Sequence, residues 1–189
     1  TNNHVQQIDG NIIRTNQNEI HAERIVVATS PRQTQQWFGN FEYPQMVDCT
    51  TWYHVTDSAP TTYKAILVDS LARGPVLNSS AISLVAPLYA SGGRVLLSST
   101  TLGTDSSSEQ ETRVKTHLSQ LWHSDVSHWQ TVRAHVVRDA LPVHAPNTAM
   151  QRPIQVNDHT WLAGDYLNTP SQQGALLSGR RAAEALLAS

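Results

Sequence analysis

The chain of 189 residues has little cysteine, little net charge and no long hydrophobic run. Its one cysteine, Cys49, cannot form an internal disulfide, which excludes the disulfide-stabilised folds of oxidising compartments and predicts a small core residue. A net charge of -2 without runs of Lys or Arg argues against nucleic acid or anionic membrane as a partner. No transmembrane span or signal peptide is recognisable. These absences predict a cytoplasmic, globular protein of one or two domains.

The first 31 residues predict short strands joined by turns. An Asp-Gly-Asn turn at residues 9–11 and a polar turn at residues 16–18 separate segments of alternating residues, which is typical of hairpins. The end of the third segment, residues 25–28, is a continuous apolar run and is therefore expected to be buried on both faces. The strands are expected at residues 5–8, 12–15 and 20–28, followed by a short helix over 31–38.

The middle of the chain has the β-branched and aromatic bias of an antiparallel sheet. A capping box starting at Ser106 or Ser108 predicts one helix, which would end near Trp122. Nine histidines suggest a metal site, but His117, His123 and His128 lack metal-ligand spacing and are expected to be exposed, with no metal bound. Strands are expected over residues 46–56, 62–68, 81–86, 94–100 and 129–140, and a loop over 142–153.

Residues 161–187 predict a short buried strand, a loop that carries Asp165, and a helix. Small residues at helical spacing, among them Ala175 and Gly179, would make one flank of this helix flat. Because glycine costs about 1 kcal/mol in a helix, Gly179 suggests close approach of a neighbouring element. The helix start offers free N–H groups and the positive end of the helix dipole to an electron-rich ligand.

Two segments resemble the flavin-dependent amine oxidase superfamily, which includes amine oxidases, protoporphyrinogen oxidases and phytoene-desaturase-like enzymes. Gly164-Asp165, the following loop and Gly-Ala-Leu-Leu-Ser-Gly-Arg-Arg-Ala-Ala at 174–183 are similar to its C-terminal FAD-contacting motif. Ala-Thr-Ser-Pro at 28–31 is similar to the end of a strand in its FAD-binding domain. The order and separation of both segments fit the family.

The resemblance implies roles for individual residues. Asp165 would hold the ribityl and pyrophosphate side of FAD, the backbone of Val5 would meet the adenine, and the last helix would point its N-terminus at the flavin. No catalytic residue is assigned: Lys64 has no supporting local motif and is expected on the surface. The implied cofactor-binding residues are Val5, Ala28, Thr29, Gly164, Asp165, Gln173, Gly174 and Ala175.

The family's glycine-rich nucleotide turn is missing, because Gly92-Gly93 is not followed by a third glycine. The chain is therefore expected to be the C-terminal portion of a two-domain FAD-dependent oxidoreductase. Its fold class would be α/β and α+β, with parts of an NAD(P)-binding-like FAD domain at 1–35 and 156–189. These would flank a mainly antiparallel substrate-binding α+β domain at 36–155. Alone, the fragment is expected to be inactive, to bind FAD poorly and to self-associate.

The full-length protein would move a hydride between flavin and a mostly apolar small molecule. Polar Gln172 and Gln173 stand where monoamine-type oxidases of the family place an aromatic pair, which puts amine oxidation itself in question. Two alternatives remain open at this point. One is a non-catalytic α+β interaction module, and the other is a flavin-dependent reductase or isomerase that uses NAD(P)H.

Overall fold

The computed structural model describes residues 2–42 and 44–188. The chain forms two compact units: unit 1 comprises Thr1–Met46 with Leu141–Ser189, and unit 2 comprises Val47–Ala140. Both contain antiparallel sheets, and helices complete the mixed α/β architecture that the sequence predicts. The predicted domain limits at residues 35 and 155 lie inside unit 1, and the roles assigned to these domains remain predictions.

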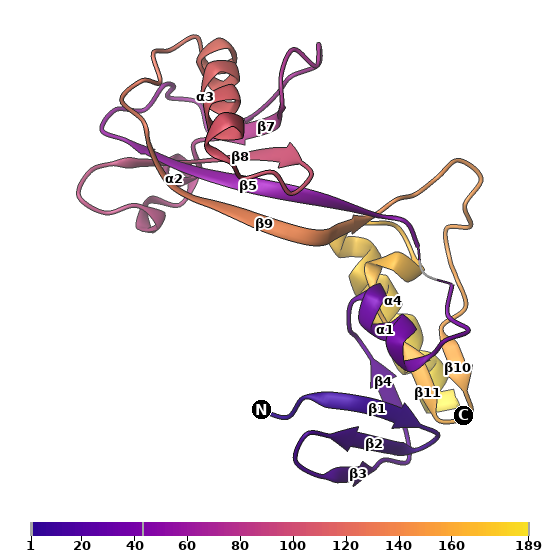
Figure 1. Ribbon diagram of the computed structural model, residues 1–189. Helices are drawn as coiled ribbons and strands as arrows, with labels where there is room; N and C mark the ends of the chain where they lie inside the picture. Colours follow the sequence, from indigo (N-terminus) through magenta and orange to yellow (C-terminus); the bar gives the residue numbers. More distant parts are fainter. Residues whose placement is uncertain (1, 43, 189) are drawn as a thin grey trace. The chain divides into compact units, whose positions relative to one another are not determined.

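A three-stranded antiparallel meander begins unit 1 (Figure 1). Its first turn is made by Gly10, whose positive φ of 58° suits glycine. Thr15 closes the second turn, since its hydroxyl donates to the Asn18 carbonyl at 2.9 Å. The strands are β1 (Val5–Asp9), β2 (Ile12–Thr15) and β3 (Glu19–His21), in that order.

The second sheet of unit 1 joins segments from both ends of the chain. Its order is β10-β11-β4, in which β11 pairs with β10 antiparallel and with β4 parallel. One core cluster, which includes Ile25, Val27 and Leu162, packs with the meander, and another places Trp161 against the last helix. The elements are β4 (Ile25–Val27), α1 (Pro31–Trp37), β10 (Gln155–Asn157), β11 (Thr160–Leu162), η2 (Asp165–Leu167) and α4 (Gln172–Ala188).

Two predictions about unit 1 are wrong in detail. The strand expected over residues 20–28 is divided into β3 and β4, which belong to different sheets. Burial of residues 25–28 on both faces is also wrong, because Val26 is 46% exposed while Ile25 and Val27 are buried. The run is apolar on both sides, yet only one side is covered by the described part of the chain.

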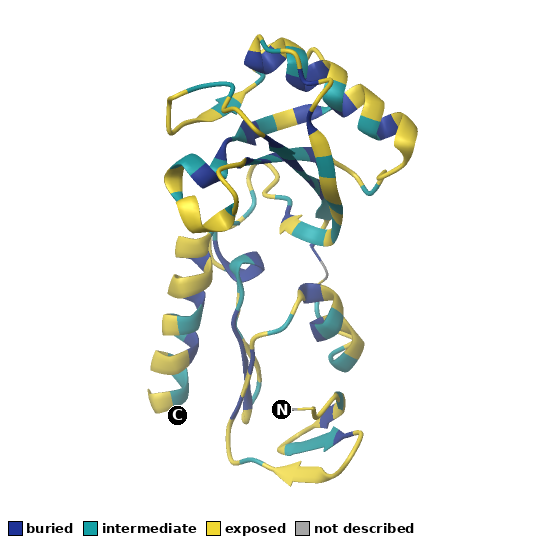
Figure 2. Cartoon of the chain, turned by 90° about the vertical axis from the view of Figure 1, so that its left-hand side faces the viewer, coloured by how far each residue is buried: buried dark blue, intermediate teal, exposed yellow. Residues whose placement is uncertain are grey.

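The packed flank of α4 lies one residue away from the predicted one. Gly174, Ser178 and Ala182 are its buried residues, whereas Ala175 is exposed. Figure 2 shows this C-terminal helix buried along one side and exposed along the other. The close approach expected at Gly179 is wrong, since a Cβ built there would have nothing within 4 Å. Close approach occurs instead at Gly174, so the glycine that packing requires begins the helix.

Unit 2 is built on a five-stranded sheet with the order β6-β7-β8-β5-β9. Leu118 and Val114 of the long helix α3 join Trp52 and Leu97 of the sheet in one buried core, so α3 covers one face. The elements are β5 (Met46–Thr56), β6 (Ile66–Val68), β7 (Val76–Ser80), α2 (Ile82–Val85), η1 (Pro87–Tyr89), β8 (Val95–Leu102), α3 (Ser108–Trp122) and β9 (Gln130–Pro142).

Several local predictions for unit 2 are wrong. The strand expected at residues 81–86 is the helix α2, because a short apolar run does not distinguish helix from strand; β7 just before it was not predicted. The cap of α3 is Ser107, which accepts from the Gln110 backbone N–H at 3.2 Å, not Ser106 or Ser108. Cys49, which was predicted to be a core residue, is only half-buried. Burial, aided by the Asp48 carboxylate, raises the pKa of its thiol.

No helix among residues 2–42 and 44–188 has the length and apolarity needed to cross a membrane.

Candidate cofactor site

The carboxyl ends of β4 and β11 meet at one edge of the second sheet of unit 1. These strands are parallel, with Ile25 opposite Thr160 and Val27 opposite Leu162. The Ala163 N–H extends the pairing by donating to the Val27 carbonyl at 2.9 Å. The residues that follow, 28–29 and 164–165, therefore leave the sheet at the same edge. In open α/β sheets this is the edge at which ligands bind.

Gly164 fixes the path of the chain beyond β11. A Cβ at this position would overlap the ring of Tyr166, so a larger residue would force the ring to move. The Gly164 N–H donates to Ser178 Oγ at 2.9 Å, and Ser178 is fully buried in α4. The strand end and the helix are thus locked together beside the candidate site.

Gly174 and Ser171 define the start of α4. Ser171 Oγ accepts from the Gly174 N–H at 3.0 Å, and the Ser171 carbonyl accepts from the Ala175 N–H at 2.9 Å. A Cβ on Gly174 would overlap the backbone carbonyl of Thr169. Glycine is therefore required for the loop to approach the first turn this closely.

The first turn of α4 presents free donors. Gln172 and Gln173 are exposed, and their backbone N–H groups lie where an α-helix provides no acceptor. The positive end of the helix dipole adds to these donors. This turn can stabilise an anion or an electron-rich ligand atom. Ala175, also predicted to bind cofactor, is exposed one turn further on, with its N–H already used.

Asp165 lies between the strand end and the helix, in the first turn of η2. Its residue is half-buried, and no group in the described part of the chain donates a hydrogen bond to its carboxylate. Nearby in the sequence, Asn168 is 8% exposed and its Nδ2 has no partner among the described residues. The loop thus offers an unused acceptor and an unused buried donor.

Tyr166 and Thr34 contact each other next to the carboxyl edge of β4 and β11. Their roles were not predicted from the sequence. Tyr166 is 3% exposed, and its hydroxyl lies 3.2 Å from Thr34 Oγ1. Burial raises the pKa of Tyr166; the Asp165 charge adds to this, while the hydrogen bond to Thr34 opposes it. The neutral phenol therefore ties the loop after β11 to α1, which follows β4.

Ala28, Thr29 and Val5 were also predicted to bind the cofactor, and they differ in their distance from this edge along the fold. Ala28 is exposed, and the Thr29 hydroxyl lies 3.4 Å from that of Thr34. Val5 belongs to β1 in the meander and packs half-buried against the core shared with β4 and β11. The parallel pairing thus brings Ala28, Thr29, Gly164 and Asp165 to one edge, whereas Val5 belongs to a different sheet.

Arg181 also stabilises the loop around the site. It is half-buried and donates to the Arg152 carbonyl at 3.0 Å and to the Leu167 carbonyl at 3.4 Å. Arg180 instead pairs with Glu184 at 2.7 Å on the exposed face. The sequence hardly distinguishes the roles of Arg180 and Arg181, because two adjacent arginines on a helix differ only in the side of the helix that they face.

The structure places His117 in α3, while His123 and His128 follow that helix. No group of three potential ligands occurs among the described residues. His117, which was expected to be exposed, is 2% exposed: its Nδ1 accepts from the Val76 N–H at 3.1 Å and its Nε2 lies 3.0 Å from Asp69 Oδ2. The first bond requires Nδ1 to be unprotonated, so Nε2–H donates to Asp69. His117 therefore holds the loop before β7 against α3.

Comparison with known families gives a match over nearly the whole chain. The model of the family described as "Flavin containing amine oxidoreductase" matches residues 2–187. A search of curated proteins finds no match.

Several solved structures with a similar fold are described as oxidases. A putative protoporphyrinogen oxidase from Exiguobacterium sp. 255-15 has a TM-score of 0.72 at 14% identity, over 97% of this chain and 46% of that one. Cyclohexylamine oxidase from Brevibacterium oxydans IH-35A has a TM-score of 0.65 at 15% identity, over 97% and 47%. Putrescine oxidase bound to putrescine has a TM-score of 0.61 at 11% identity, over 99% and 48%. The chain spans about half the length of these proteins.

Proposed function

Because the chain belongs to the flavin containing amine oxidoreductase family, we propose that the carboxyl edge of β4 and β11 holds part of an FAD cofactor. The observation that carries this proposal is the parallel pairing of β4 with β11, which brings the two family-like segments to one edge. Without it, Ala28-Thr29 and Gly164-Asp165 would be unrelated loop residues.

The groups at this edge fit a flavin nucleotide. The free carboxylate of Asp165 can accept hydrogen bonds from ribityl hydroxyls, and the N–H groups of Gln172 and Gln173 can donate to the electron-rich pyrimidine side of the ring. The unpartnered Nδ2 of Asn168 is a further donor in the same loop. When bound, FAD would supply hydride acceptance and donation, while these residues bind and orient it.

The cofactor-binding site would be completed by a segment outside these 189 residues. The pyrophosphate of a dinucleotide needs a glycine-rich turn that lets it approach the backbone. No such turn is present here, and the solved relatives are about twice as long as the matched part. Residues 1–189 alone would therefore bind FAD weakly and be inactive.

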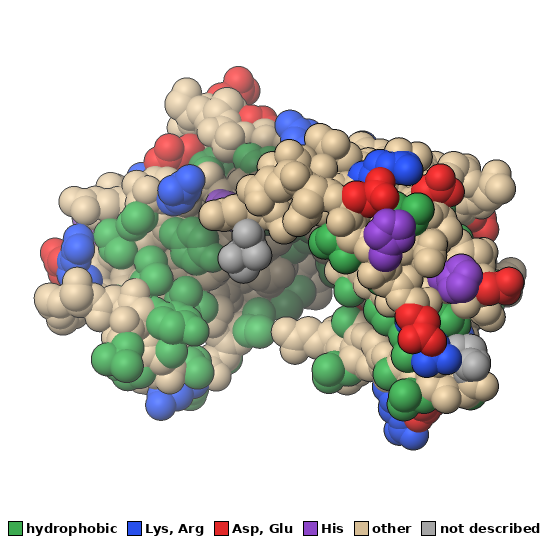
Figure 3. All heavy atoms as spheres, turned by 90° about the horizontal axis from the view of Figure 1, so that it is seen from below, with side chains coloured by type: hydrophobic (Ala, Val, Ile, Leu, Met, Phe, Trp, Pro, Cys, Tyr) green, Lys and Arg blue, Asp and Glu red, His purple; other side chains and the backbone are tan. Residues whose placement is uncertain are grey.

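Unit 2 would bind the substrate on the sheet face that α3 leaves open. On β5 and β8, Tyr53 lies opposite Ser98 and Val55 opposite Leu96, alternating with the residues buried under α3. On β6, Ile66 and Val68 are 69% and 67% exposed. The space-filling view shows hydrophobic side chains gathered at its left, with charged ones mainly near the margins (Figure 3).

On strands β5 to β8 this open face has a composition suited to a mostly apolar, uncharged molecule, while the exposed residues of the fifth strand, β9, include Arg133, His135 and Arg138. On strands β5 to β8 its side chains alternate with the covered ones and include neither acids nor bases. They are Cys49, Thr51, Tyr53, Val55, Ile66, Val68, Asn78, Ser80, Leu96, Ser98, Thr100 and Leu102. The full protein would therefore move a hydride between such a small molecule and flavin. Lys64, exposed just before β6, would take no part.

The visible absorption spectrum of the protein purified from its complete gene tests the cofactor assignment. A flavin spectrum is expected, and Asp165→Ala should reduce the bound flavin, since it removes the free acceptor. Asp158→Ala, which alters an exposed turn of the same unit, should leave the flavin content unchanged. A folded, colourless protein that takes up no added FAD would refute the proposal and favour a non-catalytic module.

A further inference from the structure

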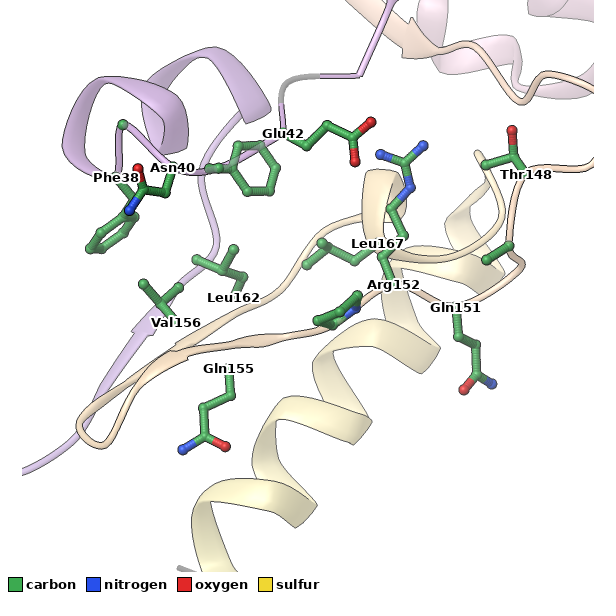
Figure 4. Close-up of a pocket in the computed structure, with 14 residues that line it drawn as sticks. Phe38, Asn40, Glu42, Thr148, Gln151, Arg152, Gln155, Val156, Leu162 and Leu167 are labelled. Atoms are coloured by element: carbon green, nitrogen blue, oxygen red, sulfur yellow. The ribbon is translucent and has the colours of Figure 1, made fainter.

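A concave site lies in unit 1, beside the loop that carries Asp165 and Asn168. It is a cavity of about 790 Å³ formed by the segment after α1, the segment before β10, and β10, β11 and η2 (Figure 4). None of the eight residues predicted to bind cofactor lines it. Its volume is within the range of small-molecule sites, roughly 300–1,000 Å³.

The inner part of this cavity is apolar. Leu162 and Leu167 are 3% and 1% exposed and form part of the core of unit 1. Phe38 and Val156 extend this surface toward the opening, and Figure 4 shows both on the same side of the cavity as Leu162. An apolar group placed here would be removed from water, which stabilises binding by about 25 cal/mol per Å² of apolar surface buried.

One end of the cavity carries opposite charges. In Figure 4 the Glu42 carboxylate and the Arg152 guanidinium point toward one another, and both residues line the cavity. No ion pair within 4.0 Å joins them in the described part of the chain. Both charges therefore remain available to a ligand.

The backbone of Arg152 is held on both sides. Its N–H donates to the Leu167 carbonyl at 3.1 Å, and its carbonyl accepts from Arg181 Nη2 at 3.0 Å. These bonds fix the point from which the side chain reaches the cavity. A charged group on a fixed backbone loses less conformational freedom on binding than one on a mobile loop.

The geometry points to a binding site for a zwitterion with an apolar body, such as an α-amino acid with a large hydrophobic side chain. Its carboxylate would pair with Arg152 and its ammonium group with Glu42, while the side chain lies against Phe38, Leu162 and Leu167. An isolated carboxylate would be repelled by Glu42, and an isolated amine by Arg152. Only a ligand with both charges satisfies both residues.

Equilibrium dialysis of the complete protein in oxygen-free buffer tests this site with three probes. L-phenylalanine carries both charges, 3-phenylpropionate lacks the ammonium group, and 2-phenylethylamine lacks the carboxylate. Phenylalanine should bind at least about threefold more tightly than either analogue, because an ion pair near the surface contributes on the order of 0.5–1 kcal/mol. Equal binding of all three, or no binding of phenylalanine, would overturn the assignment.

Charge-neutralising variants locate the binding. Arg152→Gln and Glu42→Gln should each weaken phenylalanine binding about threefold or more. Both should fold, because Arg152 is bonded to the described part of the chain through its backbone and Glu42 is exposed; circular dichroism checks this. Arg94→Gln and Glu23→Gln, at exposed positions outside the cavity, are matched controls and should bind normally. Phenylalanine binding that neither cavity variant changes would place it elsewhere and refute the proposal.

Discussion

The backbone N–H of Gly164, at the end of β11, donates to the hydroxyl of Ser178, two turns into α4, at 2.9 Å. This bond joins the strand that carries Asp165 to the helix whose first turn is part of the proposed cofactor site. Ser178 is fully buried, so a residue without the hydroxyl would leave the N–H unsatisfied. Such a loss costs about 1–3 kcal/mol.

Ser178→Ala should therefore lower the free energy of unfolding by about 1–3 kcal/mol, as measured by urea denaturation. Ser91→Ala, at an exposed turn in unit 2, is the control and should leave stability within about 0.5 kcal/mol of the original. If the two variants were equally stable, the bond would not contribute to holding strand and helix together.

The two glycines of α4 should respond in opposite directions to alanine. Gly174→Ala would drive a methyl group into the Thr169 carbonyl, so it should destabilise the protein and reduce flavin content. Gly179→Ala has open space around it and should stabilise the helix by up to about 1 kcal/mol. Thermal denaturation of both variants is the measurement. A stabilising Gly174→Ala would show that the loop before α4 can move away freely.

The strand, loop and helix around Asp165 could be predicted because their signals are local, whereas the parallel pairing of that strand with β4 was not predicted. An apolar strand, an acid and a helix with small residues follow each other directly in the sequence, and the family resemblance identified a second segment at residues 28–31. The exact packed flank of α4 could not be predicted, because Ala175 and Gly179 are as small as Gly174 and Ser178. Only the tertiary contact with Thr169 and Gly164 decides between these flanks.

Unit 2 was harder to predict because its decisive contacts are distant in sequence. His117 is buried by its bonds to Asp69 and Val76, about forty residues or more away, and nothing near His117 in the sequence indicates them. The helix α2 was mistaken for a strand because its four residues are too few to show a period. Bonds to distant residues therefore explain the burial of His117, while α2 is too short to give a local signal.

His54 in unit 2 should make stability depend on pH. It is fully buried, and neither ring nitrogen has a hydrogen-bond partner in the described part of the chain. Burial, with a smaller effect of the Lys115 charge, lowers its pKa from 6.5 to about 4, against the opposing effect of Glu111. The unfolded chain therefore binds a proton more tightly than the folded one, and stability falls as pH drops from about 6.5 toward 4.

The expected loss is on the order of 3 kcal/mol between these pH values, from about 1.4 kcal/mol per pKa unit. Urea denaturation at a series of pH values measures it. His54→Leu removes the titrating group and should flatten this part of the profile, while His128→Leu, at an exposed position, should not. Identical pH profiles for the original protein and His54→Leu would contradict the assignment.

Residues 1–189 alone should self-associate through the edge of the second sheet of unit 1. In the order β10-β11-β4, β4 is an edge strand of the described sheet, and its Val26 is 46% exposed. An exposed, apolar edge strand is a template for pairing with another chain, and a lysine there opposes it. Sedimentation velocity should show mass that rises with concentration, and Val26→Lys should shift it toward monomer. Gln6→Lys adds the same charge at an exposed position of β1 and should have no such effect. A monomer at all concentrations would show that this edge does not pair between chains.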